Sequence, residues 1–126
     1  MRLTDERGSA VAEFTMVAAL LVVLVLSVMQ LALAMHVRAT VADAAAEGAR
    51  HASLVGADGT AGVARTRALI TTAIGAQYAE EITATTATVD GLETIEIRVA
   101  APLPLFGLLG PTALEVAGHA PLESLG

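Results

Sequence analysis

The chain has 126 residues, enough for one domain, and its net charge of −6 includes seven basic residues that are all arginines. An acidic chain without a basic cluster argues against nucleic-acid binding, and the lack of cysteine excludes disulfides, thiolate metal sites and a cysteine nucleophile. Hydrophobic residues make up 55%, but with two Phe, one Tyr and no Trp the core must consist mainly of Ala, Val and Leu. We therefore expect a soluble part of modest stability that neighbouring subunits would stabilise.

A short polar segment, residues 1–8 (MRLTDERG), precedes a long apolar run. The 22 residues from Phe14 to Met35 carry no formal charge, and a helix of this length crosses a hydrocarbon core of about 30 Å. The rest of the chain is too small to surround such a helix, so we expect a membrane span rather than a buried core helix. A secretory signal cleaved near Ala32 or Ala34 is the alternative, although its apolar region would be shorter.

The helical pattern continues beyond the span. No proline or glycine interrupts positions 9–47, and we expect one helix from about Ser9 to about His51, about 65 Å long, whose second half stands clear of the membrane. A stripe of small and apolar residues on this second half allows close approach of another helix. The stripe consists of Val37, Val41, Ala45, Gly48 and Ala52, while Asp43, Glu47 and Arg50 lie toward another face.

A glycine-rich segment, Val55–Gly62 (VGADGTAG), follows this helix. Its spacing fits neither the P-loop nor the dinucleotide-binding motif, so we expect a flexible turn. From Val63 to Glu81 the apolar positions share one helical face, which predicts a second, amphipathic helix. These positions are Val63, Ile70, Ala73, Ile74 and Tyr78.

The last third of the chain predicts strands. Ile82–Val89 is rich in β-branched residues, and Asp90-Gly91 is a strong hairpin signal. In the next strand the apolar side chains face one side of the sheet and the charged ones the other: Ile95, Ile97 and Val99 against Glu96 and Arg98. A third strand is expected at 113–120, where Leu114 and Val116 face the opposite side from Glu115 and His119. The predicted fold class is α+β: a long N-terminal helix, a short amphipathic helix and a small antiparallel sheet.

The connection at 102–111 (PLPLFGLLGP) is unusually apolar. We expect it to fold over the open face of the sheet, with a docking patch for a partner or the membrane surface as the alternative.

No catalytic or metal-binding pattern emerges. His36, His51 and His119 are expected in three different elements and lack the i,i+3 or i,i+4 partners that metal sites on helices use. The serines show no G-x-S-x-G elbow, and the neighbouring carboxylates of Glu80 and Glu81 are expected to point apart into water. We expect no enzyme activity, no metal and no cofactor.

One pattern stands out, RGSAVAEF at residues 7–14. A charged leader ends in Gly8, and a lone carboxylate, Glu13, lies five residues later inside the apolar segment. A carboxylate costs about 2.5–3.5 kcal/mol at a bilayer centre and less near its edge, so such residues usually have a partner. The simpler interpretation is an interfacial glutamate in the first helical turn, stabilised by the helix dipole.

This segment resembles the type III signal sequence of the type IV pilin superfamily, which has a short basic leader, a glycine before the scissile bond, a glutamate at the fifth mature position and an apolar helix. Within that superfamily the chain most resembles the TadE-like proteins, minor pseudopilins of the tight-adherence (Tad) pilus. The resemblance rests on four features: RGSAVAEF at 7–14, the apolar span, Gln30, and VRATVADAAAEGARHAS at 37–53. The residues Glu47, Gly48, Ala49 and Arg50 match the E-G-A-R ending of the family's alanine-rich stretch.

The resemblance implies a prepilin leader at 1–8, cleaved between Gly8 and Ser9 by a prepilin peptidase, and a long helix at 9–52 with its span at about 14–35. A small α+β extracytoplasmic domain would follow at 53–126. The subunit would be a single-pass protein of the cytoplasmic membrane with a cytoplasmic N-terminus, or would reach the cell surface in a pilus. Its implied partners are membrane lipid, other pilin or pseudopilin subunits and the pilus assembly platform, and Glu13 would set the register between helices. The alternatives are a minor pseudopilin of type II secretion and a membrane-tethered binding module.

Overall fold

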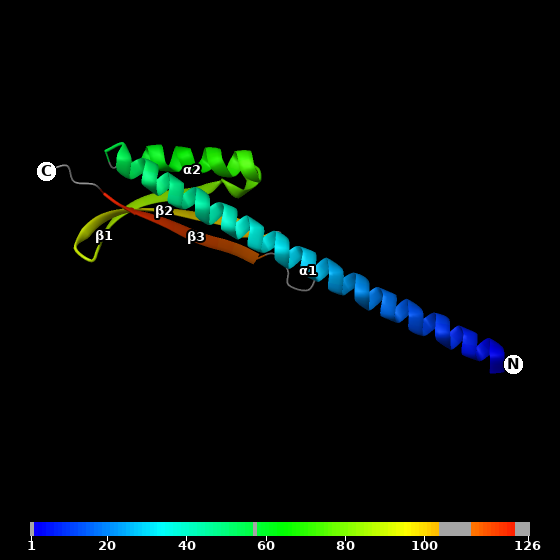
Figure 1. Cartoon of the computed structure of the whole chain (residues 1–126). Coiled ribbons are helices and arrows are strands. Elements are labelled where there is room, and N and C mark those ends of the chain that lie inside the picture. Colours follow the sequence, from blue (N-terminus) through cyan, green and yellow to red (C-terminus); the bar gives the residue numbers. More distant parts are fainter. Residues whose placement is uncertain (1, 57, 104–111, 123–126) are drawn as a thin grey trace.

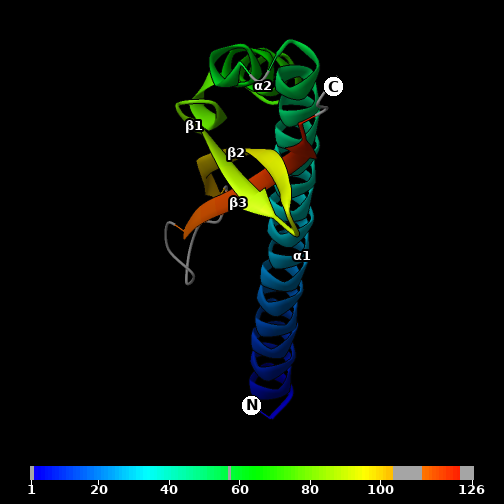
Figure 2. The ribbon, with the colours of Figure 1, turned by 90° about the vertical axis from the view of Figure 1, so that its left-hand side faces the viewer.

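The computed structural model describes residues 2–56, 58–103 and 112–122. In chain order the elements are α1 (Arg2–Leu54), α2 (Gly59–Ala73), the 3₁₀ turn η1 (Ala76–Tyr78), β1 (Glu81–Val89), β2 (Leu92–Leu103) and β3 (Thr112–Pro121). The C-terminal half of α1 packs with α2 and the sheet into a small folded domain, while its N-terminal half projects away as a single helix (Figures 1 and 2). The predicted α+β class and its pilin-like layout are confirmed.

The first helix is longer than the sequence analysis predicted. It begins at Arg2 rather than about Ser9, because residues 2–8 contain no proline and Gly8 alone does not break a helix. It ends at Leu54, just before Gly56, whose φ of 82° is not helical and suits glycine. The 53 residues of α1 therefore span about 80 Å.

The second helix lies earlier in the chain than predicted. It runs from Gly59 to Ala73 instead of Val63–Glu81, so half of the expected glycine-rich turn is helical. Asp58 explains the start: its side chain caps the helix by accepting a hydrogen bond from the amide of Thr60 at 3.0 Å. Gly75, with a φ of 116°, explains the end, and the turn η1 leads from there into β1.

The sheet is an antiparallel meander with strand order β1-β2-β3. Asp90 and Gly91 both have positive φ, as a two-residue type I′ hairpin requires, and Val89 pairs with Leu92 across the turn. At the other end, Leu103 of β2 pairs with Thr112 of β3. The first two residues of the apolar connection, Pro102 and Leu103, are therefore strand residues; its part from 104 to 111 lies outside the described residues.

One face of the sheet carries the core. As predicted, Ile95, Ile97 and Val99 are buried on this face, and α1 covers β2 and β3 while α2 covers β1. The predicted small-residue stripe of α1 is the other wall of the core. All five of its members are buried, together with Ala44 and Ala49. The core is thus built from small side chains that allow helices and sheet to approach closely.

Glycines set the closest approaches. A Cβ on Gly118 of β3 would overlap the backbone of Ala45 and Ala46 in α1. On the other side of α1, a Cβ on Gly48 would overlap Oγ1 of Thr66 and lie 2.8 Å from the carbonyl oxygen of Gly62. The predicted stripe thus packs against both the sheet and α2.

Candidate functional site

The N-terminal half of α1 exposes a long apolar surface. From Val11 to Leu33 the large apolar side chains are exposed, and the most apolar 18-residue window of α1 has a mean hydropathy of 2.7 and no buried residue. A core helix of a soluble domain would be mostly buried, and this segment is not. The chain therefore has one N-terminal helix that is long and apolar enough to serve as a single-pass membrane anchor.

Polar side chains inside this segment bond to their own helix. The hydroxyl of Thr15 donates to the carbonyl of Val11 at 2.8 Å, and that of Ser27 donates to the carbonyl of Val23 at 2.7 Å. Both groups are thereby satisfied without water, as an apolar environment requires.

The predicted leader junction lies on the same helix. Gly8, Ser9 and Glu13 are exposed, and a Cβ on Gly8 would meet no atom within 4 Å. Among the described residues no ion pair involves Glu13. Ser9 and Glu13 are one helical turn apart, about 6 Å along the axis. The carboxylate is therefore available to a group outside the fold.

The residues of the E-G-A-R segment divide between core and surface. Gly48 and Ala49 are buried, whereas Glu47 and Arg50 face outward and form an i,i+3 ion pair at 3.5 Å. Gly48 lies where α1 contacts Thr66 and Gly62 of α2. In this structure the segment is thus the packing site of the two helices, with an exposed ion pair of small energetic value beside it.

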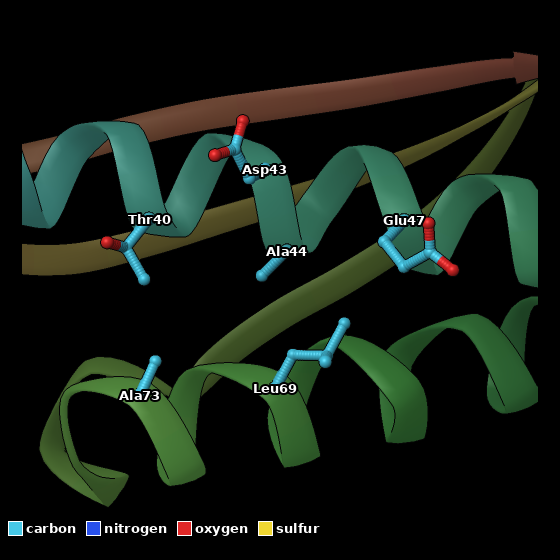
Figure 3. Close-up of a pocket in the computed structure, with 6 residues that line it drawn as sticks. All are labelled: Thr40, Asp43, Ala44, Glu47, Leu69 and Ala73. Carbon is cyan, nitrogen blue, oxygen red and sulfur yellow. The ribbon is translucent and has the colours of Figure 1, made fainter.

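A groove of about 390 Å³ runs between the two helices beside this contact. Thr40 and Ala44 of α1 face Ala73 and Leu69 of α2 across it, and Asp43 and Glu47 also line it (Figure 3). Its two carboxylates make it acidic. Its lining holds one hydroxyl, that of Thr40, and no histidine or lysine, and no group of three or more potential metal ligands occurs in the described part of the chain.

The open face of the sheet carries a charged network. Glu96 lies on the central strand, and one of its carboxylate oxygens accepts hydrogen bonds from Arg98 at 2.7 and 3.0 Å. Its other carboxylate oxygen lies 2.8 Å from Nε2 of His119. Arg98 also donates to the carboxylate of Glu115 at 2.5 Å. The hydrogen bonds from Arg98 and from His119 lower the pKa of Glu96 below its ordinary value. The network joins β2 to β3 and offers no open site.

The histidines and paired glutamates are placed as follows. His36 and His51 share α1, so the expectation of three separate elements is wrong, since the helix continues past both; His119 is on β3. Glu80 and Glu81 are both exposed, as expected. Thr66 was not predicted as a site residue; it is fully buried, and its hydroxyl donates to the carbonyl of Gly62 at 2.8 Å. No sequence pattern marks this position, because the contact of Gly62 with Gly48 becomes visible only in the fold.

The fold and its exposed apolar helix define a class: an α+β protein of pilin-like layout with a helix suited to anchor it in a membrane. The model of the TadE-like protein family matches residues 8–50, which include Gly8, Glu13 and the E-G-A-R segment. Over this segment, which lies within α1, the chain is similar to the TadE-like family. No curated protein and no solved structure matches the chain.

Proposed function

We propose that the chain is a minor pseudopilin, a membrane-anchored structural subunit that takes part in assembling a Tad-type pilus. One observation carries the proposal: the TadE-like segment is a single helix whose first half is apolar and exposed and whose second half is the core of a folded domain. Such a helix links a membrane to a domain outside it without a flexible joint. A structural subunit needs such a rigid link, and this role requires no catalytic centre.

The proposal divides the chain into a leader at 1–8, a helix at 9–52 with its span at about 14–35, and an extracytoplasmic domain at 53–126. A prepilin peptidase would cut between Gly8 and Ser9, and the exposure of both residues is compatible with access to that bond. Because the bond lies inside α1, the helix must open locally there, and glycine lowers the cost of opening by about 1 kcal/mol relative to alanine.

Glu13 is the proposed register residue. Cleavage would create a positively charged α-amine on Ser9, and Glu13 could pair with the amine of its own chain or of a neighbouring subunit. Pairing between chains would fix how far one helix is shifted along the other. The absence of an ion pair of Glu13 within the described residues leaves its carboxylate free for such a partner. In low dielectric a pair is stronger than on a surface, although desolvation offsets part of the gain.

The test is co-assembly of Glu13 variants. Glu13→Leu is expected to insert into the membrane as well as wild type, because it removes a charge from the apolar segment, but to lose cross-linking to other pilus subunits. Glu13→Asp should be partly defective, because its side chain is shorter. Thr15→Leu is the matched control, since Thr15 is also exposed and polar but bonds within its own helix.

Co-purification from membranes gives the readout. Wild type and Thr15→Leu should recover other pilin subunits and the assembly platform, and Glu13→Leu should not. If Glu13→Leu co-assembles like wild type, Glu13 is only an interfacial residue and the register role is wrong. Recovery of a type II secretion platform instead would reassign the subunit to that system.

A further inference from the structure

Among the described residues, no strand pairs with the outer edge of β1. In the described part of the chain, β1 pairs only with β2, and the direct pairing of Val89 with Leu92 across a two-residue turn fixes which backbone groups point outward. Hydrogen-bonded pairs then fall at odd-numbered residues of β1, so the amides and carbonyls of the even-numbered residues point to the free edge. These residues are Ile82, Ala84, Thr86 and Thr88. Among the described residues no backbone hydrogen bond joins any of them to another element.

This edge lacks the features that usually prevent a strand from pairing. The eight residues Ile82–Val89 contain no charge, no proline and no glycine, and the continuous register shows no bulge. The opposite edge strand, β3, lies directly against α1 at Gly118 and contains Pro121. An added strand would therefore find free backbone groups along the edge of β1, the strand whose core face α2 covers (Figures 1 and 2).

A groove accompanies the edge. It has a volume of about 470 Å³ and lies between the first turns of α2 and β1. Gly59, Thr60 and Val63 line it from α2, and Ile82, Thr83 and Ala84 line it from β1. An extended chain paired with β1 would direct every second side chain toward this groove. Since a Cβ on Gly59 would lie only 2.9 Å from Cβ of Ala84, the groove is narrow at that end and suits small side chains there.

The charges beside the edge indicate the occupant. Glu80 and Glu81 are exposed at the start of β1, and Asp90 and Glu93 are exposed around its end. A second copy paired antiparallel through β1 would bring acidic residues of the two chains together at both ends, which is unfavourable. A strand with basic residues at its ends would instead meet opposite charges.

We propose that the β1 edge binds an extended segment of a partner protein by strand addition, and that this segment has small β-branched residues at alternate positions and a basic residue at each end. Backbone hydrogen bonds to the even-numbered residues of β1 would give the affinity, and the groove beside α2 would select the side chains. This proposal does not depend on the proposed function, because it uses only β1, α2 and their flanking charges.

The test uses the full chain in lipid nanodiscs and the synthetic octapeptide RTVTVTVR. Residue-resolved amide exchange should show that the peptide slows exchange at least fivefold at Ile82, Ala84, Thr86 and Thr88. The odd-numbered amides from 83 to 87 should be unchanged, because they already bond to β2. No binding of the peptide, or protection centred on the α1–α2 groove, would overturn the proposal.

Matched variants separate pairing from general adhesion. Thr86→Pro removes one amide that points to the free edge and should weaken peptide binding about tenfold, whereas Thr86→Val keeps the amide and should bind like wild type. The acidic peptide ETVTVTVE should bind more weakly than RTVTVTVR. Equal binding of both peptides, or protection of β1 by dimerisation of the chain alone, would show that the assignment of a basic partner is wrong.

Discussion

Gly48 shows how a single position of the family segment acts in this fold. Its lack of a side chain lets α1 approach Thr66 and Gly62 of α2, and the neighbouring Ala49 is buried beside it. Of the polar members of the segment, Glu47 is half-buried and Arg50 is exposed, and their ion pair contributes little to stability. The structural requirement in E-G-A-R is therefore its small central pair.

Gly48→Ala should destabilise the folded domain by about 1–3 kcal/mol, because the new methyl group overlaps Thr66 and must push α2 away. Unfolding by denaturant in detergent, followed by a probe on α2, measures the change. Gly8→Ala is the matched control: its Cβ would meet nothing within 4 Å, so the domain should unfold as in wild type. Adding Thr66→Ala to Gly48→Ala should recover part of the loss, and the absence of any recovery would argue against this contact.

Glu96 makes the open sheet face sensitive to acid. Its pKa is lowered by hydrogen bonds from Arg98 and His119, so the folded state binds a proton less readily than the unfolded state. The stabilisation is complete above the ordinary glutamate pKa of 4.5 and is lost as the pH falls through the lower pKa of the folded state. Thermal unfolding should show a steeper loss of stability below pH 4.5 for wild type than for Glu96→Gln. If the stability of the two proteins fell equally with pH, Glu96 would not be stabilised by Arg98 and His119 as described.

At the scale of the element, α1 changes environment along its length without a break. Its exposed apolar side chains extend to Met35, and the first buried residue in the described part of the chain is Ala34, shortly before the small-residue stripe that packs on the sheet and on α2. One helix thus supplies the proposed anchor and the wall of the core. A movement of the proposed membrane segment would therefore be transmitted directly to the folded domain.

The exposed half of α1 allows a substitution that separates insertion from folding. Leu24 is exposed and contacts no part of the domain core, so Leu24→Arg should leave the fold intact but oppose insertion by about 2.5–3.5 kcal/mol at the bilayer centre. Membrane fractionation should show less of the variant in the membrane. Leu54→Arg, at an exposed residue outside the span, is the control and should fractionate like wild type. Equal fractionation of both variants would contradict the proposed span.

The elements differ in how well the sequence predicted them. The β-hairpin was predicted closely, because Asp90-Gly91 and the alternation of Ile95, Ile97 and Val99 are local signals. The start of α2 was not predicted, because the glycines of Val55–Gly62 suggested a turn. In the structure, Gly59 and Gly62 belong to α2 and allow close contacts with its neighbours. The need for glycine at these two positions comes from contacts with Ala84 and Ala52, which belong to other elements of the fold. Likewise, the free edge of β1 depends on strand order, which periodicity does not specify.

At the scale of the whole molecule, the structure is a long rod with a small folded domain around its C-terminal half (Figure 1). The domain core consists largely of Ala, Val and Ile, so its stability depends on close packing rather than on large side chains. In the proposed assembly, helices of neighbouring subunits would cover its exposed apolar half. The same surface would serve the membrane before assembly and neighbouring subunits afterward.

The central claim is that the chain is a processed, membrane-anchored pilin-like subunit, and the mass of the intact protein tests it most directly. The full chain is isolated from membranes of cells that contain or lack the prepilin peptidase. We predict that it begins at Ser9 in the first case and at Met1 in the second, with the same amount in the membrane in both. An N-terminus at Met1 in both strains, or cleavage near Ala34 in both, would contradict the account.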